Sequence, residues 1–191
     1  MSNTLLMTSR VTGGGRDERA GASVRRASAR DARRLTRLVR TSSAYEGPYA
    51  PMIAGYRVGP DYIETHRVHV AVGQDGRILG FYALVLSPPE LDLMFVADDA
   101  QGRGIGRLLM DHMKREARAA GLAGVRIVSH PPAEGFYLGV GARRVGTVVA
   151  RPPAVMWDRP ELELPTGEGP LVSSGPLGQA PFGADGASSV V

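Results

Sequence analysis

A glycine-rich turn in the middle of the chain is the feature that most constrains its fold. Residues 96–109, VADDAQGRGIGRLL, join an apolar run to a segment with helical periodicity. A strand that leads through such a turn into a helix directs unpaired backbone N–H groups at one point, where the positive end of the helix dipole favours an anion. Glycine has no Cβ, so an anion can approach the backbone closely. By itself the turn predicts either an anion site or a tight packing turn.

Two common nucleotide-binding motifs do not fit this turn. A P-loop requires the pattern G-x-x-x-x-G-K-[ST], and the turn contains no lysine. A dinucleotide-binding fold carries its glycines in the first strand–helix–strand unit and an acidic residue about twenty positions further on. Here the turn lies in mid-chain, and the region near Arg126 offers no acid. Both motifs are therefore poor fits.

Hydrophobic periodicity predicts that strands alternate with helices around the turn. Ser28 and Asp31 form a capping box that begins a first helix, and a long helix starts at Ile105. A short helix is expected over 131–137, and residues 42–63 are expected to be irregular or weakly helical. The expected strands cover 66–73, 77–86, 90–96, 125–129, 142–149 and 154–158. Because the early strands form a hairpin and the later ones cross over through helices, we expect an α/β fold with a mostly antiparallel sheet.

One compact domain is expected between two flexible ends. Residues 1–21 contain few large apolar side chains, which predicts a flexible leader. Residues 165–191 are rich in Gly, Pro and Ser without periodicity, which predicts a disordered tail and leaves 22–164 for the domain. The beginning of the chain does not resemble a secretory signal, and no apolar run approaches about 18 residues. A cytoplasmic protein that does not contact the membrane is therefore expected.

The composition excludes several kinds of site. The chain has no cysteine, so disulfides, thiolate metal sites and cysteine nucleophiles are excluded. Its four histidines are scattered without a helical His-x-x-x-His pair, and no metal site is expected. Residues 1–40 hold ten arginines against three acidic residues, which suits either a nucleic-acid surface or a solvated basic face. We favour the solvated face, because no nucleic-acid-binding motif accompanies the charge.

Two motifs, in order along the chain, resemble those of one enzyme family. The run Gln101-Gly102-Arg103-Gly104-Ile105-Gly106 is similar to the Q/R-x-x-G-x-G/A motif of the GNAT superfamily of acyl-CoA-dependent N-acetyltransferases. The run HPPAEGFY, residues 130–137, followed by Gly141-Ala142, is similar to the N-x-x-A-x-x-x-Y…G-F/A motif of the same family. The resemblance extends over about residues 24–158. It implies a mostly antiparallel mixed sheet of six to seven strands, flanked by helices and splayed between the fourth and fifth strands.

The resemblance also implies the donor and how it is held. Acetyl-CoA would place its pyrophosphate on the backbone amides of the glycine turn and its pantetheine arm along the end of the preceding strand. His130 stands where the family often has asparagine, which puts a contact from that side chain in question. The residues expected to contact acetyl-CoA are Met94, Phe95, Val96, Gln101, Gly102, Arg103, Gly104, Ile105, Gly106, Arg107, His130 and Tyr137.

The catalytic residues implied by the resemblance are a phenol and a carboxylate. Tyr137 matches the tyrosine that lies near the thioester sulfur and protonates it as it leaves; the alternative is a tyrosine buried in the core. Period-two alternation puts Glu90 and Asp92 on the strand face that also carries Met94 and Val96. Glu90, then Asp92, are the candidate bases for the acceptor amine. A solvated role for Glu90, or a base elsewhere, is the alternative.

The acceptor is expected to bind near residues 42–63, which line the acceptor pocket in relatives. The candidate acceptor-binding residues are Tyr45, Glu46, Tyr49 and Tyr56, which suit an aromatic or cationic amine but also suit a core. The expected activity is transfer of acetyl to a primary amine of a small molecule. Protein N-termini or lysines are alternative acceptors, and a non-catalytic acyl-CoA sensor is the alternative class. Dimers are common in the family, so a homodimer is also considered.

Overall fold

The computed structural model describes residues 21–53, 55–153 and 155–167 of the 191-residue chain. Most of the expected leader and tail lies outside these ranges. The strands are β1 (Ala22–Arg26), β2 (Arg67–Gly73), β3 (Ile78–Leu86), β4 (Pro89–Val96), β5 (Gly124–Val128), β6 (Arg143–Val148) and β7 (Arg159–Pro165). The α-helices are α1 (Ala32–Arg40), α2 (Pro60–Thr65), α3 (Ile105–Ala119) and α4 (Glu134–Gly139). Short 3-10 turns cover Ala29–Asp31, Ser43–Tyr45, Gly47–Met52, Asp98–Ala100 and Pro131–Ala133.

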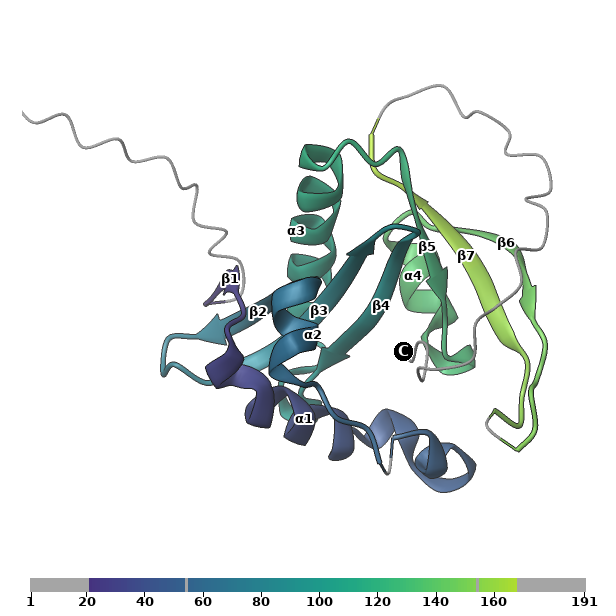
Figure 1. Ribbon diagram of the computed structural model, residues 1–191, viewed down its shortest axis with the longest axis horizontal. Coiled ribbons are helices and arrows are strands. Elements are labelled where there is room, and N and C mark those ends of the chain that lie inside the picture. The colour runs from purple at the N-terminus through teal and green to yellow at the C-terminus, as the bar shows by residue number, and fades with distance from the viewer. Residues whose placement is uncertain (1–20, 54, 154, 168–191) are drawn as a thin grey trace, which may run out of the picture.

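The seven strands form one sheet in the order β1-β2-β3-β4-β5-β7-β6. Every neighbouring pair is antiparallel except β4 and β5, which run parallel (Figure 1). This confirms the expected mostly antiparallel mixed sheet flanked by helices. β4 and β5 share one register pair, Glu90 with Arg126, and the pairing does not continue toward the carboxyl end of β4. The sheet is therefore splayed between its fourth and fifth strands, as expected.

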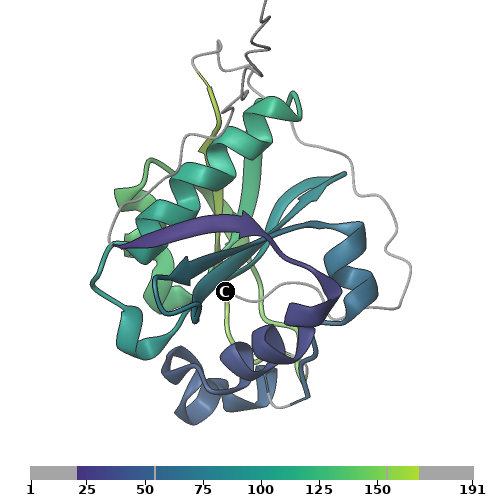
Figure 2. The same cartoon turned by 90° about the vertical axis from the view of Figure 1, so that its left-hand side faces the viewer.

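Helices cover both faces of the sheet. Figure 2 shows α3 on one side of the strands and α1 on the other. The apolar side chains of α3 and α4 share one buried cluster with one face of the sheet, and those of α1 and α2 share a second cluster with the other face. None of the helices within the described ranges is long and apolar enough to cross a membrane.

Several local predictions are confirmed. The capping box forms, because the backbone N–H of Ser28 donates to Asp31 Oδ2 at 2.9 Å. Gly76 closes the β2–β3 hairpin with a positive φ of 77°, a conformation that glycine adopts without strain. The segment that was expected to be irregular or weakly helical contains two 3-10 turns and the six-residue helix α2.

The prediction of a last strand over 154–158 is wrong. The strand is β7, at Arg159–Pro165, which lies between β5 and β6. It alternates buried leucines, Leu162 and Leu164, with glutamates, but a proline near each end obscures the pattern in the sequence. Pro165, expected to begin the tail, is its last residue, and Thr166 is buried.

A β-bulge in β4 overturns the face predicted for its carboxylates. Leu93 pairs with Ala83 while Leu91 pairs with the next residue of β3, so Asp92 is the extra residue of the bulge. Leu91 consequently packs in the cluster beneath α3, on the same face as Met94, whereas Leu93 packs toward α1. Asp92 instead accepts a hydrogen bond from the hydroxyl of Tyr62 on α2. Strict alternation, which placed the two acids on the face of Met94, therefore fails at the bulge.

Candidate active site

The splay between β4 and β5 coincides with a cavity of about 450 Å³. Its walls come from the carboxyl end of β4, from the glycine turn with the first turn of α3, and from the segment between β5 and α4. The lining residues are Ser42, Ala44, Tyr45, Met94, Phe95, Val96, Ala100, Gln101, Gly102, Gly104, Gly106, Arg107, His130, Pro132, Ala133, Phe136 and Tyr137. All the residues predicted to contact acetyl-CoA belong to this lining, except Arg103 and Ile105.

Two glycines of the turn leave their backbone open to the cavity. Gly102 and Gly104 have φ values of +71° and +81°, which side chains with a Cβ rarely adopt. A Cβ built on either glycine would meet no atom within 4 Å, so neither glycine is required by packing. Gly104 is the N-cap of α3, and no side chain caps the first turn. The N–H groups that begin α3 are therefore free to bind an anion.

The third glycine of the turn has a different role. A Cβ on Gly106 would lie 3.1 Å from the ring of Phe136, so this glycine allows α3 to pack closely against α4. Ile105 is buried in the core beneath α3 and only its backbone can serve the cavity. Arg103 is exposed and does not line the cavity, whereas Arg107 does. The turn thus contains one glycine that packing requires, Gly106, and two glycines whose backbone is open to the cavity.

The carboxyl end of β4 offers an unpaired backbone edge. Met94, Phe95 and Val96 pair with β3 on one side, through Tyr82, Phe81 and Gly80. On the other side the pairing with β5 ends at Glu90. An extended ligand can add to such an edge as a further strand.

Tyr137 presents a buried phenol to the cavity. The residue is 1% exposed, and it is held on α4 with the ring of Phe136 against its own at 5.2 Å. Burial raises the pKa of the Tyr137 hydroxyl above its ordinary value of about 10. The phenol is therefore protonated at neutral pH and able to donate a proton to a neighbouring group.

Tyr45 and His130 form another part of the cavity wall. Their rings stack with centroids 4.7 Å apart and planes at 23°. His130 Nε2 lies 3.0 Å from the carbonyl oxygen of Ala44, and burial lowers the pKa of the imidazole, so the ring is neutral and its proton lies on Nε2. Its Nδ1 is then a buried acceptor, and neither that atom nor Tyr45 Oη has a hydrogen-bond partner among the described residues. Unpaired buried groups on a cavity wall are typical of a ligand site.

An aromatic residue that the sequence did not single out extends this wall. The ring of Trp157 contacts that of Tyr49 at 4.4 Å, and Tyr49 contacts His130 edge-on at 4.3 Å. Trp157 lies on the connection between β6 and β7, which brings the only tryptophan of the chain back to the splay. Its position in a proline-rich segment without periodicity gave no signal of this contact.

The two predicted carboxylates lie at the closed end of the splay and do not line the cavity. Glu90 Oε2 is 3.0 Å from Arg126 Nη1, and the same guanidinium binds Glu161 at 2.7 Å. Asp92 holds the hydroxyl of Tyr62, and burial together with the charge of Asp92 raises the pKa of that phenol. Both acids thus belong to hydrogen-bonded networks beside the cavity.

Of the four residues predicted to bind the acceptor, Tyr45 alone lines the cavity. Tyr49 reaches it through the ring of His130, and Glu46 is exposed. Tyr56 is half-buried near Asp92, and burial and that charge raise its pKa. The structure therefore brings one of the four predicted residues to the cavity wall and leaves the other three outside its lining.

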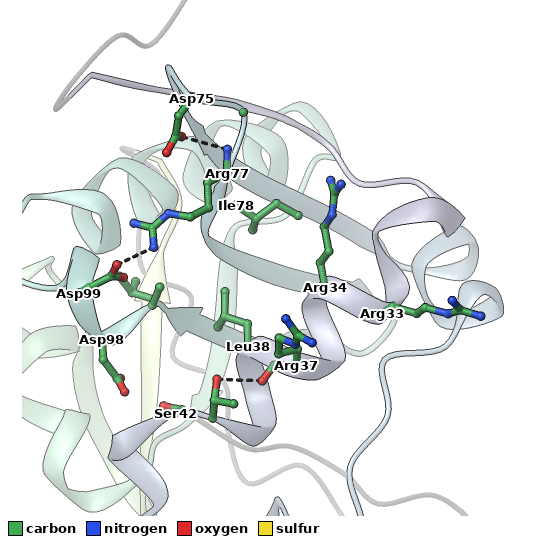
Figure 3. Close-up of a pocket in the computed structure, with 14 residues that line it drawn as sticks. Arg33, Arg34, Arg37, Leu38, Ser42, Asp75, Arg77, Ile78, Asp98 and Asp99 are labelled. Atoms are coloured by element: carbon green, nitrogen blue, oxygen red, sulfur yellow. Dashed lines mark hydrogen bonds and ion pairs between the residues drawn. The ribbon is translucent and has the colours of Figure 1, made fainter.

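A second cavity, of about 880 Å³, lies between α1, the β2–β3 hairpin and the end of β4 (Figure 3). We call it the arginine groove; it is lined by Arg33, Arg34, Arg37, Leu38, Thr41, Ser42, Asp75, Gly76, Arg77, Ile78, Val96, Ala97, Asp98 and Asp99. It shares Ser42 and Val96 with the smaller cavity. Arg77 pairs with Asp99 at 2.5 Å. Figure 3 shows the guanidinium groups of Arg33 and Arg34 pointing in different directions.

Comparison with protein families identifies the domain. Residues 58–151 match the model of the family described as "Acetyltransferase (GNAT) domain". The matched segment includes β4, the glycine turn, α3 and Tyr137. No curated protein sequence matches the chain.

Comparison with solved structures shows the same fold. A GCN5-related N-acetyltransferase from Rhodopseudomonas palustris is 17% identical, with a TM-score of 0.63, and the match covers 75% of this chain and 94% of that one. The ribosomal-protein alanine N-acetyltransferase of Escherichia coli is 18% identical, with a TM-score of 0.59, over 78% of this chain and 96% of that one. A spermidine N-acetyltransferase chimera from Vibrio cholerae is 16% identical, with a TM-score of 0.60, over 76% and 96%.

Proposed function

The chain carries an acetyltransferase (GNAT) domain in a GNAT fold, and from this premise we propose that it transfers acetyl from acetyl-CoA to the primary amine of a small molecule, with Tyr137 as the general acid. One observation carries the proposal. A single cavity combines two open glycines, the uncapped start of a helix, an unpaired strand edge and a buried phenol.

The residues present fit the proposed donor. Backbone N–H groups from Gly102 to Arg107 would hold the pyrophosphate, with the side chain of Arg107 adding charge. The free edge of β4 at 94–96 would bind the amides of the pantetheine arm. Bound in this way, acetyl-CoA supplies an acetyl group activated as a thioester.

Tyr137 would act on the sulfur. When the amine nitrogen forms its bond to the acetyl carbon, the carbon–sulfur bond breaks and the electron pair stays on sulfur. The CoA thiol, with a pKa of about 8.5 like that of cysteine, gains from protonation as it leaves. Burial keeps the Tyr137 proton available for that transfer, and the products are the N-acetylated amine and the free thiol.

Glu90 is the proposed base for the proton that the amine loses. It lies at the closed end of the splay, with Arg126 fixing its carboxylate. Since Glu90 does not line the cavity, a bridging water would carry the proton to it. Asp92, which is the bulge residue of β4 and holds Tyr62, is the second candidate.

The aromatic wall supports a small cationic acceptor. Tyr45, Tyr49, His130 and Trp157 present ring surfaces at one side of the splay, and ring faces attract ammonium groups. Among the structural neighbours, the spermidine enzyme is named for a small polyamine and the E. coli enzyme for an alanine of a ribosomal protein. The comparisons therefore support acetyl transfer to amines of both kinds, and the wall favours the small one.

A screen of primary amines tests the proposal. The purified full chain is mixed with acetyl-CoA and single amines, and free thiol and acetylated product are both measured. We expect thiol release with at least one small amine, and its loss in Tyr137→Phe. Turnover with peptide amines alone would contradict a small-molecule acceptor and indicate a protein acceptor. Binding of acetyl-CoA without any turnover would indicate a sensor.

A further inference from the structure

Three side chains with metal-ligating atoms meet between α3 and β2, outside both cavities. They are His69 of β2 with His112 and Glu116 of α3. One nitrogen of each ring and one carboxylate oxygen lie within 4.8 Å of one another. His112 and Glu116 are one helical turn apart and so share a face of α3. Residue spacing did not predict this cluster, because its third member comes from a strand 43 residues earlier than His112.

The hydrogen bonds around the cluster leave a ring nitrogen of each imidazole for an ion. The Tyr82 hydroxyl lies 2.8 Å from His112 Nδ1, which orients the ring and leaves Nε2 for an ion. His69 Nδ1 is buried without a hydrogen-bond partner among the described residues.

The carboxylate of Glu116 already forms an ion pair with Arg67. Glu116 Oε2 lies 3.0 Å from Arg67 Nη1 and 3.8 Å from His69 Nε2. The other nearby arginine, Arg26, is engaged by the backbone carbonyls of Ile63 and His66. A metal ion in the cluster would therefore compete with Arg67 for Glu116, and that competition gives the site a testable property.

We propose that His69, His112 and Glu116 form a zinc site that ties α3 to β2. Two imidazoles and one carboxylate are a ligand set that Zn²⁺ binds, with a water in the fourth position. Zinc bonds of about 2.0–2.2 Å would bring the ligand atoms to roughly 3.5 Å from one another. The 4.8 Å limit of the cluster requires side-chain shifts of about 1 Å or less to reach that geometry. The bound ion would stabilise the packing of α3 on the sheet.

Zinc binding to the tag-free full chain tests the site. The protein is stripped with a chelator, dialysed against Zn²⁺ without acetyl-CoA, and its zinc content and Tm are measured. We expect one zinc per chain and, at zinc about a hundredfold above Kd, a Tm increase of about 5–10 °C. Glu116→Gln and His112→Gln should each weaken binding about tenfold or more.

His66→Gln is the matched control, because it removes a histidine near His69 that is not in the cluster. It should leave zinc affinity unchanged. The proposal is overturned if zinc does not bind at one equivalent, or if His66→Gln weakens binding as much as Glu116→Gln does. Because acetyl-CoA is absent, the outcome is independent of the proposed enzymatic function.

Arg67→Met separates a zinc site from a merely structural ion pair. It frees Glu116 and removes a positive charge beside the ion, so zinc affinity should rise about threefold or more. Without zinc, the same variant loses the Arg67–Glu116 pair and should be no more stable than the wild type. Unchanged or weaker zinc binding in Arg67→Met would contradict the shared carboxylate.

Discussion

The arginine groove and the cavity at the splay differ in size and in what surrounds them. The arginine groove encloses about 880 Å³ and the cavity at the splay about 450 Å³. In the groove, acidic side chains are already engaged: Asp99 by Arg77, and Asp98 by the backbone of Ser43. At the splay, no side chain caps the backbone N–H groups at the start of α3, and the hydroxyl of Tyr45 has no hydrogen-bond partner among the described residues. The smaller cavity is the better candidate site, because unpaired polar groups converge on it.

The arginine groove and the cavity at the splay also differ in the source of their positive charge. The arginines of α1 lie on its exposed face and point in different directions, so they do not converge on one anion (Figure 3). The glycine turn contributes backbone N–H groups whose positions the helix fixes. Fixed donors lose little conformational entropy when they bind, whereas long exposed side chains lose more.

The largest expected effect is a loss of acetyl-CoA affinity when a glycine of the glycine turn is substituted. Gly104→Glu places a carboxylate where the pyrophosphate is expected, at a φ of +81°, and should weaken acetyl-CoA binding on the order of 100-fold. Isothermal titration measures the affinity. Gly76→Glu is the matched control, since Gly76 has a φ of +77°, has open space around it and lines the arginine groove. Equal losses in the two variants would contradict the assignment of the cavities.

The next largest effect is expected on kcat, when the proposed general acid Tyr137 is substituted. Tyr137→Phe should lower kcat about 100-fold and change acetyl-CoA affinity by less than about threefold, because it removes a proton donor and keeps the ring. Tyr82→Phe serves as control, because its phenol is also buried but contacts His112 and does not line the cavity. Full activity of Tyr137→Phe would remove this residue as the acid.

A stability effect is expected at the start of α1, the helix whose arginines line the arginine groove. Asp31 is buried at the start of α1, and a hydrogen bond from Arg25 holds the pKa of its carboxyl at about 2. The folded pKa lies below the unfolded value of about 4, so this stabilisation is present above pH 4 and is lost as pH falls toward 2.

Asp31→Asn should therefore lower the free energy of unfolding by about 1–2 kcal/mol at pH 7 and by less near pH 2.5. Urea denaturation at the two pH values measures this difference. Asp61→Asn, at an exposed acid of α2, is the control. Acetyl-CoA affinity at pH 7 should not change in either variant; a loss in Asp31→Asn would show that α1 shapes the splay.

The smallest effect is expected for the groove arginines. The double variant Arg33→Ser and Arg37→Ser should change acetyl-CoA affinity less than about twofold at 0.15 M salt, because the side chains are exposed and screened. Arg107→Ser, which alters an arginine of the splay cavity, should weaken binding about fivefold. A larger loss of acetyl-CoA affinity in the double variant than in Arg107→Ser would indicate that the arginine groove and the cavity at the splay form one binding site.

The sequence by itself determined the local features of this protein. The order strand, glycine turn and helix, the hairpin at Gly76 and the short helix that carries Tyr137 all follow from patterns within about ten residues. The splayed sheet and most of the residues that line its cavity were implied by the resemblance of two motifs to the GNAT superfamily. Local backbone preferences and hydrophobic periodicity act over such distances, so they can be read from neighbouring residues.

Only the tertiary structure decided which side chains meet. One extra residue in β4, at Asp92, reverses the face that alternation assigns to the strand before it, and pairing with β3 decides where that residue is inserted. Trp157 reaches the splay because β6 and β7 fold back onto β5. His69 joins His112 and Glu116 because α3 packs over β2. These contacts depend on the packing of distant elements, which no short stretch of sequence records.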